Sequence, residues 1–232
     1  MSLETLLHRA DVWRGGAAPA SATGLGTALP SGFDALDAQL PGGGLPRRAL
    51  TEILLPREGI GELRFLLPLL ARLAREERWL AFIAPPHIPY APALARAGVD
   101  LARVLLVHAR AQNDALWATE QALRAGACGA VLAWPDRADF KALRRLQLAA
   151  ETGDSLGILF RPAQAAQEAT PAALRLRLEP VPDATPRLAV HILKRHGGWP
   201  AGPVTFEVRH VMDRSASPAA PARDLHARRP RS

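Results

Sequence analysis

Apolar runs of four to six residues alternate with amphipathic stretches from Leu50 onward. Short uninterrupted apolar runs predict strands that are buried on both faces, and apolar positions recurring every three to four residues predict helices. This pattern predicts strands at 50–55, 79–84, 104–108, 129–134 and 156–160, and helices at 62–75, 91–97, 114–125 and 138–151. The alternating order predicts an α/β fold with a mostly parallel central sheet flanked by helices.

The pattern changes after residue 160. Residues 161–171 form a Gln/Ala-rich stretch, which is typical of a loop. Three further apolar runs follow at 174–178, 187–194 and 204–210, separated by turns rich in proline and glycine. Such spacing predicts an antiparallel C-terminal extension of the same sheet.

Three regions are predicted along the chain. Residues 1–27 combine a short amphipathic helix with a flexible linker rich in glycine and alanine. Residues 28–211 form the α/β core. Residues 212–232 have too few apolar positions to fold and are predicted to be a disordered basic tail.

Composition restricts the class of protein further. With 232 residues, of which 48% are hydrophobic, the chain can bury one full-sized core. It contains neither a run of about 18 apolar residues nor a signal-peptide pattern, so we expect a cytoplasmic protein without membrane contact. The single cysteine, Cys128, is expected to be buried, and no Cys/His cluster has the spacing of zinc ligands.

The net charge of +7 invites a nucleic-acid interpretation, but much of this charge lies at the C-terminal end. Residues 209–232 contain six arginines against two aspartates. The scarcity of lysine and the excess of Ala, Arg, Pro and Gly also fit a GC-rich coding bias. The charge alone is therefore a weak indication of nucleic-acid binding.

Residues 56–63 (PREGIGEL) stand between a predicted strand and a predicted helix, where a phosphate-binding loop would lie. A working loop, GxxxxGK[ST], cradles phosphates with backbone N–H groups, a lysine and a hydroxyl. The residues that define this degenerate loop are Pro56, Gly59, Gly61, Glu62 and Leu63. Pro56, Glu62 and Leu63 replace the first glycine, the lysine and the hydroxyl residue. One pair of unit charges in contact near a protein surface is worth about 4 kcal/mol. Because Glu62 puts a negative charge where the lysine would be, we expect poor triphosphate binding.

The segments around this loop resemble the RecA recombinase family. They are Ser31-Gly32-Phe33-Asp34, Gly42-Gly43-Gly44-Leu45-Pro46 and Leu50-Thr51-Glu52-Ile53. The resemblance implies a RecA-like core over about residues 29–195. It also places Pro86 where the family has its catalytic glutamate, and Trp134 where it has its magnesium-supporting aspartate. We therefore predict no catalytic residue, no cofactor and no metal, and a DNA-stimulated ATPase is disfavoured.

Within this broad group, the chain resembles the ImuA family of translesion DNA synthesis-associated proteins. The resemblance rests on Val12-Trp13-Arg14-Gly15, Leu40-Pro41-Gly42-Gly43-Gly44, Leu50-Thr51-Glu52-Ile53-Leu54 and Gly59-Ile60-Gly61-Glu62-Leu63. It implies a non-catalytic adaptor in SOS-induced, error-prone DNA synthesis. The implied partners are the Y-family polymerase-like protein ImuB and an error-prone replicative-type polymerase, with RecA as a further candidate.

The alternative is a SulA-like cell-division inhibitor, a related family with the same degenerate core. Recovery of the tubulin-like division protein as a partner would favour this alternative. The predicted strands beyond Leu174 weigh against it, because the SulA family is usually shorter at this end.

Several residues are candidates for contact with a partner or for weak DNA binding. They are Leu6, Trp13, Arg161, Trp199, Arg223, Arg228, Arg229 and Arg231. Leu6 and Trp13 either contact a partner or pack on the core, and Trp199 either anchors a partner or staples a hairpin. The tail arginines either clamp nucleic acid or belong to a segment that folds on a protein.

Six positions in the predicted helices and strands are interpreted structurally. Trp117 and Phe140 stand at helical spacing with neighbouring leucines, and Trp79 begins a predicted strand. All three are therefore predicted to be core anchors. Lys141 and its neighbouring arginines are typical of a solvated helix face.

Overall fold

The computed structural model describes residues 28–109, 111–182, 187–195 and 202–207. The predicted N-terminal arm and basic tail lie outside these ranges, as do the candidate contacts Leu6, Trp13, Trp199, Arg223, Arg228, Arg229 and Arg231. The elements are β1 (Ala28–Leu29), α2 (Asp34–Asp37), β2 (Leu45–Pro46), β3 (Leu50–Leu55), α3 (Glu62–Leu73), β4 (Trp79–Ile83), α4 (Ala91–Arg96), β5 (Val104–Val107), α5 (Gln112–Arg124), β6 (Cys128–Ala133), α6 (Phe140–Thr152), β7 (Leu156–Pro162), β8 (Leu174–Val181), β9 (Arg187–Arg195) and β10 (Val204–Glu207). Short 3-10 turns lie at Ala74–Glu76, Leu101–Arg103 and Ala163–Gln167.

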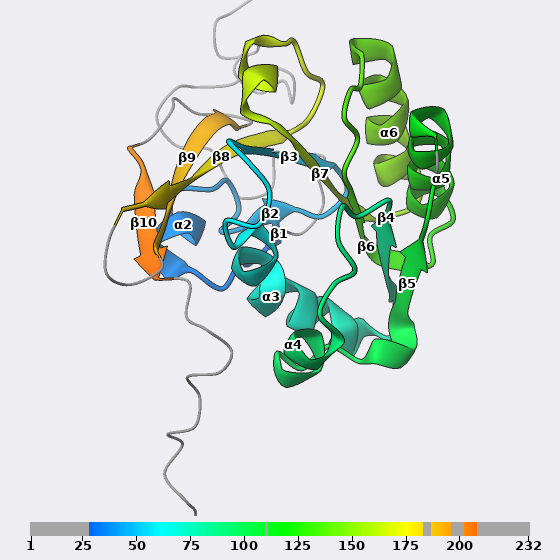
Figure 1. Cartoon of the computed structure of the whole chain (residues 1–232), viewed down its shortest axis with the longest axis horizontal. Helices are drawn as coiled ribbons and strands as arrows, with labels where there is room; N and C mark the ends of the chain where they lie inside the picture. The colour runs from blue at the N-terminus through cyan, green and yellow to red at the C-terminus, as the bar shows by residue number, and fades with distance from the viewer. Residues whose placement is uncertain (1–27, 110, 183–186, 196–201, 208–232) are drawn as a thin grey trace, which may run out of the picture.

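Within the described residues, eight strands form one twisted sheet in the order β10-β9-β8-β3-β7-β6-β4-β5 (Figure 1). The pairs from β8 to β5 are all parallel, while β9 pairs antiparallel with both β8 and β10. The strands β3, β6 and most of β7 are buried on both faces, which explains why their sequences are apolar without alternation. In β9, buried and partly exposed residues alternate, as expected for a strand with one solvated face.

Helices cover the two faces of the parallel part. On one face, α3 and α4 contribute Leu66, Leu70 and Leu94 to a core that extends under β8 and β9. On the other face, α5 and α6 contribute Leu123 and Leu143 to a second core. None of the helices in the described ranges is both long and apolar enough to span a membrane.

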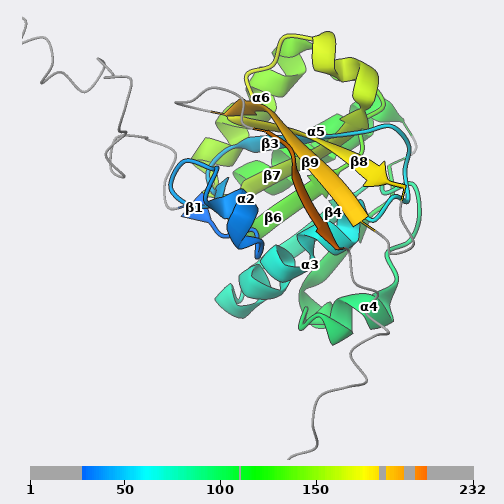
Figure 2. The same ribbon diagram turned by 90° about the vertical axis from the view of Figure 1, so that its left-hand side faces the viewer.

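A stack of three phenylalanines joins the ends of the described chain to the central helix. Phe33 beside α2, Phe65 in α3 and Phe206 in β10 have ring centroids 4.2–5.7 Å apart. Phe65 is fully buried, and Figure 2 shows β10 next to α3. This stack holds β10 and α2 against the first core.

A buried network of charges connects β3, β7 and β8. Glu52 in β3 accepts hydrogen bonds from Arg161 Nη1 and Arg175 Nε, each at 2.8 Å. Arg161 Nη2 also donates to Glu168 at 2.6 Å. Burial alone would lower the pKa of Arg161, but its bonds to Glu52 and Glu168 raise the pKa above the ordinary value. Arg161 therefore stays charged inside the protein.

Three expectations about single residues are corrected. Trp79, Trp117 and Phe140 are largely exposed and are not core anchors. On α5 the buried stripe is Ala115, Thr119 and Leu123, so Trp117 faces outward. Cys128 is buried, as predicted, and burial raises the pKa of its thiol.

The predicted RecA-like core is a wrong assignment. What the structure shows is a mixed sheet with mostly parallel strands and two antiparallel strands at its C-terminal end. An order of alternating strands and helices with a loop between β3 and α3 occurs in many doubly wound folds. The order therefore does not single out a RecA-like protein, and the comparisons below point to another family.

Candidate functional site

The carboxyl ends of the parallel strands meet at one edge of the sheet, where α/β proteins usually bind ligands. A groove of about 540 Å³ opens there, and we call it the carboxyl-edge groove. It is lined by Arg57, Gly59, Ile60, Gly61, Glu62, Leu63, Arg64, Pro86, His87, Trp134, Pro180, Val181 and Arg187. These residues come from the loop between β3 and α3, the loop after β4, the end of β6 and the β8–β9 hairpin.

The loop between β3 and α3 is closed by its own carboxylate. Gly59 N–H donates to Glu62 Oε1 and Gly61 N–H donates to Glu62 Oε2, both at 3.0 Å. Gly61 caps α3 with φ of 110°, a left-handed conformation that favours glycine. Glu62 is only 7% exposed. A carboxylate therefore occupies the position where such N–H groups would otherwise hold a phosphate.

Replacing Glu62 by alanine is expected to lower the free energy of unfolding by about 1–2 kcal/mol, because two N–H donors lose their acceptor. Urea denaturation of the purified protein measures this loss. Glu58 lies exposed in the same loop, and Glu58→Ala should change stability by less than about 0.5 kcal/mol. Equal stability of the two variants would mean that the Glu62 contacts contribute nothing.

The two positions of this groove at which an ATPase would carry acidic residues hold apolar side chains instead, Pro86 and Trp134. Trp134 stacks on Phe160 and Phe82, with ring centroids 4.6 and 6.4 Å apart. Pro86 lines the groove at the position predicted for the catalytic glutamate. Within the described ranges, no group of three or more His, Cys, Asp or Glu residues could hold a metal ion.

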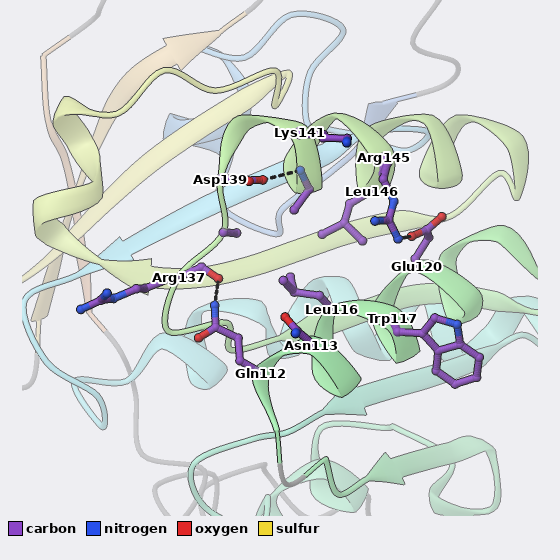
Figure 3. Close-up of a pocket in the computed structure, with 12 residues that line it drawn as sticks. Gln112, Asn113, Leu116, Trp117, Glu120, Arg137, Asp139, Lys141, Arg145 and Leu146 are labelled. Carbon is purple, nitrogen blue, oxygen red and sulfur yellow. Dashed lines mark hydrogen bonds and ion pairs between the residues drawn. The ribbon is translucent and has the colours of Figure 1, made fainter.

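A second groove lies between the N-terminal halves of α5 and α6, and we call it the α5–α6 groove (Figure 3). Its volume is about 560 Å³. It is lined by Gln112, Asn113, Leu116, Trp117, Glu120, Arg137, Ala138, Asp139, Lys141, Ala142, Arg145 and Leu146. Figure 3 shows Leu116 and Leu146 between the two helices, and Arg145 reaching across to Glu120.

Glu120 joins the two helices of this groove. It pairs with Arg145 of α6 and, at 2.7 Å, with Arg124 of its own helix. The hydrogen bond from Arg145 lowers the pKa of Glu120, against the raising effect of burial, and Arg124 lowers it further. The pair therefore stabilises the fold fully above the ordinary pKa of 4.5, and this contribution is lost as the pH falls through the lower folded-state value.

In the Glu120→Gln variant, the free energy of unfolding should consequently fall less steeply with decreasing pH between about pH 5 and pH 2 than in the unchanged protein. Thermal unfolding followed by circular dichroism across that interval measures the slope. The matched control is Asp114→Asn on the same helix, because Asp114 is exposed and makes no ion pair within the described ranges. A slope equal to that of the unchanged protein would show that the pair makes no net contribution.

The remaining candidate, Arg161, is placed inside the protein. Its guanidinium is almost fully buried and is bonded to Glu52, Glu168 and the Ala138 carbonyl. A contact with a partner or with nucleic acid would have to break this network. Lys141, Arg144 and Arg145 lie exposed on α6, as predicted. Sequence reasoning missed Trp117, which it assigned to the core.

The fold and site define an α/β protein whose loop between β3 and α3 is filled by its own carboxylate. A family described as cell division inhibitor SulA matches residues 50–157, just under half of the chain. SulA of Edwardsiella piscicida is 34% identical over 97 residues, which cover 42% of this chain and 58% of that protein. SulA of Photorhabdus laumondii is 32% identical over 112 residues, which cover 48% of this chain and 63% of that protein.

A solved structure also matches. The crystal structure of SulA from Pseudomonas aeruginosa has 31% sequence identity and covers 48% of this chain and 97% of that chain, with a TM-score of 0.42. The chain spans only about three fifths of the length of the two curated relatives named above, since it covers 58% of one and 63% of the other.

These comparisons correct the sequence-based identification. The predicted ImuA family, and with it the translesion adaptor, is wrong, because the family and the named relatives are cell-division inhibitors. The expected partners, ImuB, the error-prone polymerase, RecA and DNA, are not supported either. The findings favour the alternative, a SulA-like inhibitor. The C-terminal strands β8 to β10 lie beyond the matching segment and do not exclude it.

Proposed function

We propose that this protein is a cytoplasmic, non-catalytic inhibitor of cell division. The observation that carries the proposal is the match of residues 50–157 to the family of cell division inhibitor SulA. This segment runs from β3 to the beginning of β7, so it comprises both helical layers and most of the parallel sheet. The partner we propose is the tubulin-like division protein.

The geometry of the carboxyl-edge groove supports a role in binding without turnover. The Glu62 carboxylate holds the N–H groups of Gly59 and Gly61, and its negative charge would repel a phosphate. Pro86 and Trp134 offer no acid or base to a reacting water. Phosphoryl transfer in ATPases of this kind relies on a lysine and acidic residues at these positions, and the basic side chains of the groove, Arg57, Arg64, His87 and Arg187, lie outside them.

The exposed apolar side chains supply a candidate contact surface. The large hydrophobic residues that are exposed in the described ranges all lie within 50–157, the segment shared with the inhibitors. Ile88 and Tyr90 stand out, with 76% and 69% of their surfaces exposed. In the sequence they closely follow Pro86 and His87, which line the carboxyl-edge groove. Paired exposed apolar residues at a groove are typical of protein-binding sites.

Controlled expression in rod-shaped bacteria tests this proposal. We expect long undivided cells with regularly spaced chromosomes, because division stops while growth and replication continue. The double variant Ile88→Ser/Tyr90→Ser should restore normal cell length at equal protein level. Leu148→Ser, which replaces an exposed residue of α6, should still cause long cells. Cells of normal length at high protein level would reject the proposed function, and long cells with the double variant would reject the proposed surface.

A further inference from the structure

The α5–α6 groove combines an aliphatic floor with a large exposed aromatic side chain. Leu116, Ala142 and Leu146 form the floor. Trp117 stands beside it, 62% exposed. On α5, positions 113, 116, 117 and 120 form one stripe of the helix. On α6, positions 142, 145 and 146 form the facing stripe, and Ala138 lies just before that helix. The two packed helices therefore leave between them a groove in which aliphatic side chains are surrounded by polar and charged ones.

The charges around this groove are unequal. Both lining carboxylates are engaged within the protein: Glu120 pairs with two arginines, and Asp139 accepts the Ala142 N–H at 2.7 Å. Arg137 and Lys141 line the same groove and form no ion pair with a described residue. The groove is consequently left with cations that can attract a negatively charged partner.

We propose that the α5–α6 groove docks an acidic peptide segment of a protein partner. An apolar side chain of that segment packs against Leu116 and Leu146 beside Trp117, and its carboxylates pair with Lys141 and Arg137. The groove volume of about 560 Å³ lies in the usual range for ligand sites, and an apolar centre with a charged rim is the usual anatomy of an interface.

The chemistry of the groove favours a peptide over a nucleic acid. Binding of single-stranded nucleic acid relies on successive aromatic platforms for stacked bases, whereas this groove has one aromatic residue above aliphatic side chains. An amphipathic acidic helix matches better, because its apolar face fits the floor and its flanks carry the carboxylates. The groove follows α5 from Gln112 to Glu120, which is long enough to accompany about two turns of such a helix.

Fluorescence anisotropy with two designed peptides tests this proposal on the full chain. Both peptides have 16 residues with leucines at helical spacing, one flanked by glutamates and the other by lysines at the same positions. We expect the glutamate peptide to bind at least about tenfold more tightly than the lysine peptide, with an affinity that falls as salt is added. Trp117→Ala and Lys141→Glu should each weaken binding about tenfold or more.

Controls separate this site from the proposed division-inhibiting surface. Trp79→Ala removes an exposed tryptophan of β4, and Ile88→Ser/Tyr90→Ser alters the proposed division-inhibiting surface, and both variants should bind the glutamate peptide normally. Urea denaturation confirms that Trp117→Ala is folded. The proposal is overturned if the glutamate peptide does not bind, if both peptides bind equally, or if Trp117→Ala and Lys141→Glu have no effect. Tighter binding of a 20-nucleotide thymidine oligomer at Trp117, or a dimer dispersed by Trp117→Ala, would also overturn it.

Discussion

Replacing Glu52 by alanine is expected to lower the free energy of unfolding by about 3–5 kcal/mol. Glu52 is fully buried and accepts hydrogen bonds from both Arg161 and Arg175. Its removal leaves two buried guanidinium groups with one remaining carboxylate, Glu168, and the uncompensated charge opposes folding. Chemical denaturation with urea, monitored by tryptophan fluorescence, measures this loss.

The matched control for this variant is Glu179→Ala. Glu179 lies in β8 and pairs with Arg177 and His191, each at 3.1 Å, but its side chain is 43% exposed. Surface pairs of this kind contribute about 0–1 kcal/mol. If Glu52→Ala and Glu179→Ala lower the free energy of unfolding by the same amount, the buried network does not hold β3, β7 and β8 together as described.

The second large effect is expected for Phe65→Ala, with a loss of about 3–5 kcal/mol. Phe65 is fully buried, and its ring centroid lies 5.6 Å from that of Phe33 and 5.7 Å from that of Phe206. The substitution leaves a cavity between α3, α2 and β10, because it removes the ring of α3 that contacts Phe33 and Phe206. Differential scanning calorimetry and urea denaturation measure the change.

Phe140→Ala removes the same chemical group from the start of α6, where the ring is 54% exposed, and should cost less than about 1 kcal/mol. A loss of similar size in the two variants would contradict the described packing. A small loss for Phe65→Ala alone would show that β10 is not held through the aromatic stack.

The helices and strands from Leu50 onward could be predicted to within about three residues of their ends, whereas α2 and the β1–β2 pair were not predicted. The predicted strand at 50–55 is β3, and the predicted helix at 62–75 corresponds to α3 and the following 3-10 turn. This succeeded because parallel strands buried on both faces are continuous apolar runs, and because α3 has a strongly amphipathic sequence. The predicted boundaries at 1–27 and 212–232 stay predictions, since those residues lie outside the described ranges.

The buried charges could not be predicted in the same way. Arg161 is 109 residues from Glu52 in the sequence, and Arg175 is 123 residues from it. No local pattern indicates such a pairing, so Arg161 looked like an exposed loop residue. In the structure β7 continues to Pro162, which carries Arg161 inside. The register of β3 with β8 then places Glu52 opposite Arg175.

The faces of α5 and α6 also escaped prediction. Apolar residues on α5 occur on more than one side, and the small residues Ala115 and Thr119 turned out to face the core. Trp117 was assigned inward because leucines stand near it at helical spacing, but the buried residues of α5 are Ala115, Thr119, Glu120 and Leu123. A large hydrophobic residue on the outer face of a helix is therefore better regarded as a candidate contact.

The loop at residues 56–63 shows a different limit of sequence reasoning. The exchange of a lysine for Glu62 predicted weak phosphate binding from charge alone. The structure adds the reason in atomic terms, because the carboxylate accepts both loop N–H groups. The wider resemblance to RecA-like proteins led to a wrong prediction of a RecA-like core, because it rested on an order of elements that many α/β proteins share.

The most direct test of the proposed function is polymerisation of the purified tubulin-like division protein with GTP, followed by light scattering, in the presence of this protein. The account predicts that polymerisation falls in proportion to the added protein and stops near equimolar amounts. Ile88→Ser/Tyr90→Ser should have little effect, and Trp117→Ala should inhibit fully. Unchanged polymerisation at a clear excess of folded protein would contradict a direct inhibitory role.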